Sequence, residues 1–179
     1  MLKMENTVLL LIDIQGKLAH LMHEKERLFD NLQKLIKGIQ ALGLPILWVE
    51  QYPDGLGPTI PEIASLLPDN KPISKMSFSS CRNETFLRVL KKQNRRQVLV
   101  AGIETHICVY QTAADLVAMG YEVQVVTDAV SSRVGENKQV GLQKMRTAGA
   151  LMTSVETALF ELLRVAGGDV FKKIVRIVK

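Results

Sequence analysis

Three residue types that support nucleophilic catalysis follow separate apolar runs of the chain: Asp13, Lys75 and Cys108. The thiolate is the reactive form of cysteine, a nearby ammonium group stabilises it, and a carboxylate can accept the thiol proton. We expect a helix to begin near Thr105, so that Cys108 lies in its first turn, where the helix dipole and unpaired N–H groups also favour thiolate. The pattern indicates a nucleophile, Cys108, with Asp13 as base and Lys75 as electrostatic partner.

Each of these residues also has a simpler interpretation. A lone cysteine is often a buried packing residue, and Asp13 and Lys75 are equally suited to a structural ion pair at the edge of a sheet. Cys81 has no acid and lysine arranged around it in the sequence pattern, and we expect it to be structural. The chemical interpretation therefore depends on whether the fold brings the three residues together.

The elements that would position them alternate along the chain. Continuous apolar or β-branched runs predict buried strands at 7–12, 44–49, 98–101 and 121–127, with shorter ones at 72–75 and 150–152. Helical spacing of apolar residues predicts helices at 28–42, 62–67, 86–90, 105–117, 136–148 and 156–163.

This alternation predicts an α/β fold, a doubly wound three-layer αβα sandwich with a mainly parallel six-stranded, Rossmann-like sheet. We expect one domain over residues 1–179, because nothing in the chain resembles an interdomain linker. In such sheets ligands bind beyond the carboxyl ends of the strands. Asp13, Lys75 and Cys108 should therefore converge at one edge.

Several local details can also be predicted. Asp128 should follow the end of the fifth strand, and Thr153 with Glu156 forms a Thr-x-x-Glu capping box for the helix after the sixth. The segment 53–61, with three prolines and two glycines, should be an ordered loop or lid. The segment after Gly167 and Gly168 is amphipathic, and its secondary structure stays open.

Composition excludes several classes of protein. The chain is 47% hydrophobic and 23% charged, and it has no apolar run of the roughly 20 residues that a membrane span needs. The net charge is +5, but the basic residues are spread over several helices without a nucleic-acid-binding motif, so we expect no nucleic-acid partner. Two cysteines form no disulfide framework and the amino terminus lacks the pattern of a secretory leader, which favours the cytoplasm.

Four motifs resemble one family. They are LLLIDIQ at 9–15, KMSFSS at 75–80, VAGIETHICV at 100–109 and TDAVSSR at 127–133. In this order and spacing they are similar to the isochorismatase-like cysteine hydrolases, which include nicotinamidases and N-carbamoyl amidases. The segment EQYPDGLGPTIPE at 50–62 is most similar to the isochorismatase-domain-containing subgroup, whose members largely lack an assigned substrate.

The resemblance implies the isochorismatase-like hydrolase fold, with Asp13, Lys75 and Cys108 as a catalytic triad. It implies a non-proline cis peptide bond between Ile103 and Glu104, which turns the Glu104 N–H toward an oxyanion site that the Cys108 backbone completes. It also implies a homo-oligomer, a dimer or larger. Glu104 is expected to contribute its backbone rather than its carboxylate.

Two departures from the family limit the choice of substrate. Nicotinamidases carry an Asp-x-His metal-binding pattern where this chain has Glu50 to Tyr52, and its only histidines are His20, His23 and His106. We therefore expect no metal or other cofactor, and nicotinamide is a poor candidate substrate. True isochorismatases have a residue other than cysteine at the position of Cys108, which argues against hydrolysis of isochorismate.

The sequence thus predicts a metal-independent cysteine hydrolase that cleaves the C–N bond of a small amide through an acyl-enzyme on Cys108. The candidates for the substrate pocket are Gln51, Tyr52, Phe78 and His106. Arg133 is expected to form an ion pair with Asp128 rather than to bind substrate. The alternative hypothesis is a non-catalytic binding or scaffolding protein that retains the hydrolase fold.

Overall fold

A single six-stranded sheet organises the computed structural model, which describes residues 1–179. The strands are β1 (Thr7–Ile12), β2 (Ile46–Gln51), β3 (Ile73–Lys75), β4 (Gln97–Ile103), β5 (Glu122–Ser131) and β6 (Leu151–Thr153). The helices are α1 (Gly16–Ala19), α2 (Lys25–Ala41), α3 (Pro53–Leu56), α4 (Pro61–Ala64), α5 (Glu84–Lys92), α6 (Tyr110–Ala118), α7 (Gly135–Thr147), α8 (Val155–Leu163) and α9 (Gly168–Val178). Short 3-10 turns are η1 (Met4–Asn6) and η2 (Ser80–Arg82), and η3 (Thr105–Val109) is a π-helical turn.

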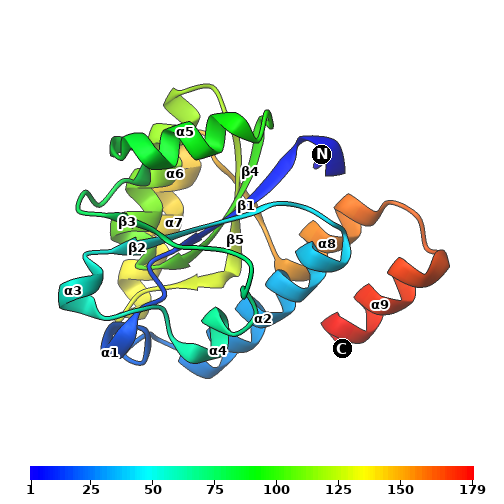
Figure 1. Cartoon of the computed structure of the whole chain (residues 1–179), viewed down its shortest axis with the longest axis horizontal. Helices are drawn as coiled ribbons and strands as arrows, with labels where there is room; N and C mark the ends of the chain where they lie inside the picture. Colours follow the sequence, from blue (N-terminus) through cyan, green and yellow to red (C-terminus); the bar gives the residue numbers. More distant parts are fainter.

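All neighbouring strands are parallel, in the order β3-β2-β1-β4-β5-β6. The chain builds outward from β1 to one edge and then from β4 to the other, so that the order reverses between β1 and β4. Helices α2 and α8 cover one face of the sheet, with α9 packed outside them, and α5, α6 and α7 cover the other face (Figure 1). The predicted doubly wound three-layer αβα fold is confirmed.

The alternating side chains of β1 explain why both faces are covered. Leu9 and Leu11 pack into the core beneath α2 and α8, whereas Val8, Leu10 and Ile12 pack into the core beneath α5 and α6. All of these side chains are fully buried. A strand that is apolar on both faces needs a helical layer on each side.

Some predicted boundaries differ from the observed ones. Strand β5 does not stop before Asp128 but continues to Ser131. The residue that caps α8 is Ser154, whose side chain accepts a hydrogen bond from the Thr157 N–H. The predicted capping by Thr153 is therefore wrong by one position, because Thr153 still belongs to β6.

One segment is more helical than expected, one is less helical, and one whose type was left open is a helix. The segment 53–61 begins with the one-turn helix α3, and the amphipathic segment after Gly167 is the helix α9, which packs on α2 and α8. The predicted helix at 62–67 is only the single turn α4.

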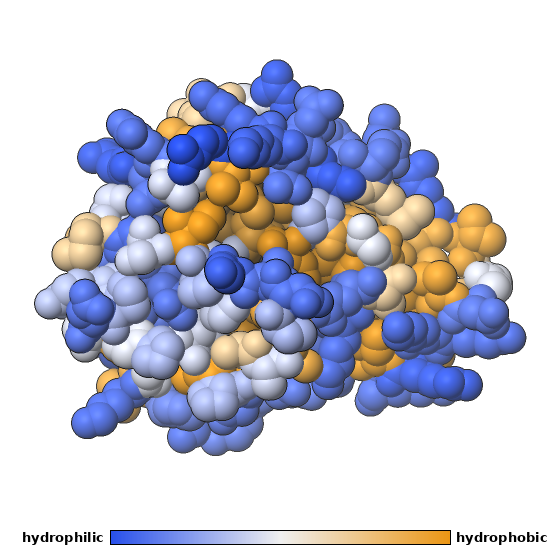
Figure 2. Space-filling view, viewed as in Figure 1, coloured by the Kyte–Doolittle hydropathy of each residue, from blue (hydrophilic) through white to orange (hydrophobic).

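Figure 2 shows mostly hydrophilic side chains over α5 and the outer side of α9, with apolar side chains visible between them. None of the helices combines the length and the apolar character that crossing a bilayer requires.

Candidate functional site

The candidate site begins with the close approach of β1 and β4 at their carboxyl ends. Ile12 pairs with Gly102, which has a φ of +122°. A Cβ on Gly102 would lie 2.1 Å from the backbone oxygen of Ile12. Only glycine permits this geometry, which sets the residue after β1, Asp13, beside the residues that follow β4.

Asp13 and Lys75 form a buried ion pair. Lys75 Nζ lies 2.7 Å from Asp13 Oδ2, and the two side chains are 0% and 3% exposed. The ammonium group also donates to Gln51 Oε1 at 2.9 Å and lies near the backbone oxygens of Ser77 and Phe78. The second carboxylate oxygen, Asp13 Oδ1, is buried and accepts no hydrogen bond. Lys75 is therefore held in place while Asp13 keeps one acceptor free.

Cys108 lies in the π-helical turn η3, which replaces the first regular turn of the expected helix. The turn is closed by the Val109 N–H, which donates to the Glu104 carbonyl at 3.3 Å, and α6 continues from Tyr110. The peptide bond between Ile103 and Glu104 is cis, as the family resemblance implies. Single π turns inserted into helices occur frequently at functional sites.

The ionisation of these groups differs from the sequence-based expectation. Burial raises the pKa of the Cys108 thiol, the Asp13 and Glu104 carboxylates add to this effect, and the Lys75 ammonium only partly opposes it. The pKa of Asp13 is also raised, because the loss of solvation outweighs the attraction to Lys75. The pKa of the Cys108 thiol is therefore shifted in the direction opposite to the expectation that the helix end and Lys75 favour thiolate.

A cavity of about 240 Å³ lies against this thiol. Its lining combines Asp13 and Cys108 with apolar side chains, and consists of Asp13, Leu18, Gln51, Leu56, Phe78, Ile103, Glu104, Ile107, Cys108 and Arg133. The volume is below the roughly 300 Å³ at which drug-sized ligand pockets begin. A ligand of this cavity must be small and largely apolar.

Only two of the four predicted pocket residues line this cavity. Gln51 and Phe78 do, although the amide of Gln51 is already engaged by Lys75 and by the Met76 carbonyl. Tyr52 does not line it: its residue is 47% exposed and its ring packs beside Gly55. His106 does not line it either, because its Nδ1 lies 2.9 Å from Ser132 Oγ, which directs the ring elsewhere.

Arg133 pairs with Glu104, and the predicted ion pair with Asp128 is wrong. Arg133 Nε lies 3.1 Å from Glu104 Oε2, and its backbone N–H donates to the same oxygen at 2.9 Å. Asp128 instead accepts the Val155 N–H at the start of α8. The carboxylate of Glu104 thus has a structural role, in addition to the oxyanion role expected of the Glu104 backbone N–H. The TDAVSSR motif was the signal that placed Arg133 near the site, although the partner was misassigned.

The segment after β2 covers the cavity and is fixed by two buried polar side chains. Glu50 Oε1 accepts hydrogen bonds at 2.7 Å from both the N–H and the hydroxyl of Thr59. Gln15 Nε2 donates to the carbonyls of Gln51 and Gly57. The sequence pattern predicts neither contact, because no local motif links Glu50 to Thr59 and the partners of Gln15 lie 36 and 42 residues away along the chain. The predicted ordered loop is thus observed, with a helical turn in it.

Cys81 lies outside the cavity. Burial and the nearby Asp115 raise its pKa to about 12, and its thiol lies 3.8 Å from the Thr112 carbonyl. It has the structural surroundings that the sequence predicts. No group of three or more His, Cys, Asp or Glu side chains is arranged to hold a metal ion.

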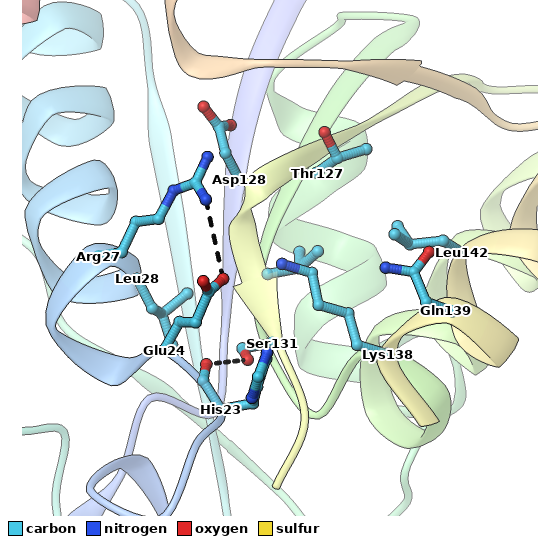
Figure 3. A pocket seen from close by; sticks show the side chains of 11 residues that line it. His23, Glu24, Arg27, Leu28, Thr127, Asp128, Ser131, Lys138, Gln139 and Leu142 are labelled. Atoms are coloured by element: carbon cyan, nitrogen blue, oxygen red, sulfur yellow. Dashed lines mark hydrogen bonds and ion pairs between the residues drawn. The ribbon is translucent and has the colours of Figure 1, made fainter. Parts of the chain in front are cut away.

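A second, more polar cleft of about 310 Å³ was not predicted. It lies between α2, β5 and α7, and its lining includes Glu24, Arg27, Asp128 and Lys138 (Figure 3). It shares no side chain with the cavity at Cys108.

Comparison with known proteins places this chain in a family. The family model described as "Isochorismatase domain" matches residues 7–157. The chain is 36% identical over 178 residues to the "Secreted isochorismatase effector Isc1" of Phytophthora sojae, covering 97% of this chain and 85% of that protein. It is 36% identical over 176 residues to the "Isochorismatase domain-containing protein 2A" of Mus musculus, covering 98% and 84%.

Solved structures of other proteins also superpose closely on this chain. A Caenorhabditis elegans protein described as "MAR1 Ribonuclease" superposes with a TM-score of 0.92 at 34% identity, covering 99% of this chain and 91% of that one. The YcaC gene product of Escherichia coli, described as an octameric hydrolase of unknown specificity, superposes with a TM-score of 0.93 at 26% identity, covering 98% and 88%.

Proposed function

Because the chain belongs to the isochorismatase family, we propose that it is a metal-independent cysteine hydrolase that cleaves the C–N bond of a small amide. The observation that carries this proposal is the meeting of Asp13 and Cys108 in one small, largely apolar cavity, with Lys75 2.7 Å from Asp13. Its relatives are described as isochorismatase domain-containing proteins, and E. coli YcaC is described as a hydrolase.

In the proposed reaction, Asp13 Oδ1 accepts the Cys108 proton as the sulfur attacks the amide carbon. Burial raises the pKa of Asp13 and so strengthens it as a base. The carbonyl oxygen becomes an oxyanion that the backbone N–H groups of Glu104 and Cys108 stabilise. The C–N bond then breaks, Asp13 returns the proton to the leaving ammonia, and a thioester remains on Cys108.

Water completes the cycle. Asp13 removes a proton from water, the resulting hydroxide attacks the thioester carbonyl, and the carboxylic acid leaves as the thiol of Cys108 is restored. Lys75 donates hydrogen bonds to Asp13 Oδ2 and to Gln51 Oε1, which fix its position beside the reacting groups. Its role is to keep Asp13 oriented.

The cavity supports a substrate of a few carbon atoms. Leu18, Leu56 and Phe78 favour an alkyl or aryl body. The two terminal amino groups of Arg133 donate no hydrogen bond within the protein, since only its Nε contacts Glu104. They are available to a carbonyl or carboxylate at the far end of the substrate.

The names of relatives raise two other possibilities. The C. elegans neighbour is described as a ribonuclease, but the only cation lining this cavity, Arg133, is paired with Glu104. Nothing at the cavity therefore favours a polyanion over a small amide.

One relative is described as a secreted effector, which suggests a location outside the cell. We propose the cytoplasm here, since both cysteines are free thiols. The octameric E. coli neighbour supports a homo-oligomer.

Release of ammonia tests the proposal. Wild-type protein is incubated with a series of aliphatic and aromatic amides of two to eight carbon atoms, and ammonia is measured. We expect turnover of at least one member, and a loss of about a thousandfold or more in Cys108→Ala. Undiminished ammonia release by a folded Cys108→Ala variant would remove the nucleophile from the proposal. If no amide of the series is turned over and the protein cleaves RNA, a ribonuclease function would replace the amidase proposal.

A further inference from the structure

The polar cleft between α2, β5 and α7 lies at the carboxyl end of β5, next to the candidate site. Ser131 contributes to the cleft, and Arg133, two residues further on, contributes to the cavity at Cys108. The wall between α2 and β5 is fixed by two hydrogen bonds: the Ser131 hydroxyl donates to the His23 carbonyl at 2.7 Å, and the His23 N–H donates to the Ser132 carbonyl. The cleft is therefore preformed.

Lys138 has no partner in this cleft. Its ammonium group makes no hydrogen bond and no carboxylate lies within 4.0 Å of it, although the residue is only half exposed. Figure 3 shows its side chain extending from α7 into the space in front of β5. Burial lowers the pKa of Lys138, with Glu24 and Asp128 acting in the opposite direction. The side-chain amide of the neighbouring Gln139 is also without a hydrogen bond, so two adjacent donors are unused.

Carboxylates line the opposite side of the cleft. Glu24 has only a loose contact with Arg27, at 3.8 Å between exposed side chains, and such a contact stabilises little. Asp128 uses one oxygen for the Val155 N–H and keeps the other free. In Figure 3 both acids lie on the α2 side of Lys138. Two cations, Lys138 and Arg27, thus share a common space with two carboxylates, and Arg27 lies between the two acids in Figure 3.

This arrangement of charges selects among ligands. A simple anion would gain from Lys138 and Arg27 but be repelled by Glu24 and Asp128, and a simple cation would meet the reverse. A ligand with one charge of each sign satisfies both sides. Leu28 and Val130 also line the cleft, but both are almost completely buried, so the charged groups determine which ligand fits.

We propose that this cleft binds a small amino-acid-like zwitterion, with its carboxylate on Lys138 and Gln139 and its ammonium group on Glu24 and Asp128. The site is independent of the hydrolase proposal, because the cleft and the cavity share no side chain.

Isothermal titration calorimetry of the full chain tests this proposal. The probes are β-alanine, 4-aminobutyrate and 6-aminohexanoate, with butyrate and butylamine as singly charged analogues. We expect at least one zwitterion to bind at one site per chain with a Kd of about 1 mM or tighter. Lys138→Met should weaken this binding about tenfold or more. Lys144→Met, on the same helix but outside the cleft, should not change it.

The proposal is overturned if no zwitterion binds, if butyrate binds as tightly as the best zwitterion, or if a folded Lys138→Met variant binds as the wild type does. Glu24→Gln gives a second test, because it should weaken the binding of the zwitterion without weakening the binding of butyrate. Cys108→Ala must retain the binding. If it loses the binding, the heat comes from the catalytic cavity and the cleft is not the site.

Discussion

The Lys75 ammonium lies 2.7 Å from the Asp13 carboxylate with neither side chain appreciably exposed to solvent. Such a pair is costly to break, because removal of one partner leaves an uncompensated buried charge. Its stabilising and catalytic roles can be separated, since only the catalytic role requires a carboxylate at position 13.

Lys75→Met should lower the free energy of unfolding by about 3–5 kcal/mol, as expected when one partner of a buried ion pair is lost. Adding Asp13→Asn should restore much of this stability, because the remaining charge is removed and asparagine tolerates the left-handed backbone of Asp13, which has a φ of +53°. Neither variant should hydrolyse amides. Denaturant titration measures the stabilities. A double variant as unstable as Lys75→Met would show that the ion pair is not the source of the loss.

Cysteine alkylation should be slow at neutral pH. Burial favours the neutral thiol and raises the pKa of both Cys108 and Cys81, the latter to about 12. Each therefore carries less thiolate at a given pH than a free thiol with a pKa of about 8.5. Labelling by iodoacetamide, followed by mass spectrometry from about pH 6 to 10, should rise with pH and stay below that of N-acetylcysteine. Fast labelling of Cys108 below neutral pH would mean that Lys75 outweighs burial.

Gly102→Ala should destabilise the protein by about 3 kcal/mol or more, because its Cβ would meet the Ile12 carbonyl at 2.1 Å in a left-handed backbone conformation. Gly43→Ala is the matched control. Gly43 also has a positive φ, +68°, but a Cβ there has no atom within 4 Å, and its cost should be about 1–2 kcal/mol. Equal losses in denaturant titrations would show that the approach of β1 and β4 is not the constraint.

Glu50→Ala should loosen the segment that covers the cavity. It removes the acceptor of two hydrogen bonds from Thr59, each about 1.5–3 kcal/mol for a charged acceptor. Limited proteolysis within 52–59 should become about tenfold faster or more. Glu62→Ala, an exposed acid just beyond this segment, should leave the cleavage rate unchanged. If Glu50→Ala also leaves it unchanged, Glu50 does not hold the segment.

The strands follow from local patterns, whereas their order in the sheet was not predicted. The run TVLLLI at 7–12 is apolar on both faces, which requires helices on both sides, and Asp13 directly after it must lie at the carboxyl edge. The convergence of Asp13, Lys75 and Cys108 was therefore predictable from strand positions and from the rule for parallel sheets.

The features of the site that the sequence did not predict depend on contacts between segments that are distant in the chain. Arg133 had two acids within reach, Asp128 and Glu104, and only the backbone path after β5 determines that Glu104 is the partner. The raised pKa of Cys108 arises from burial by surrounding elements, which the expected helix end alone did not reveal. The unpaired Lys138 is likewise visible only when α2, β5 and α7 are assembled.

The most direct test of the proposed function is to trap the acyl-enzyme. Wild-type protein is mixed with the best amide of the ammonia screen, quenched with acid within the first turnovers, and analysed by peptide mass spectrometry. We predict a mass increase equal to the acyl group on the peptide that contains Cys108, none on the peptide that contains Cys81, and none at either position in Cys108→Ala. Turnover of the amide with no acyl group on Cys108, and with ammonia release retained in Cys108→Ala, would contradict the proposal that Cys108 is the nucleophile.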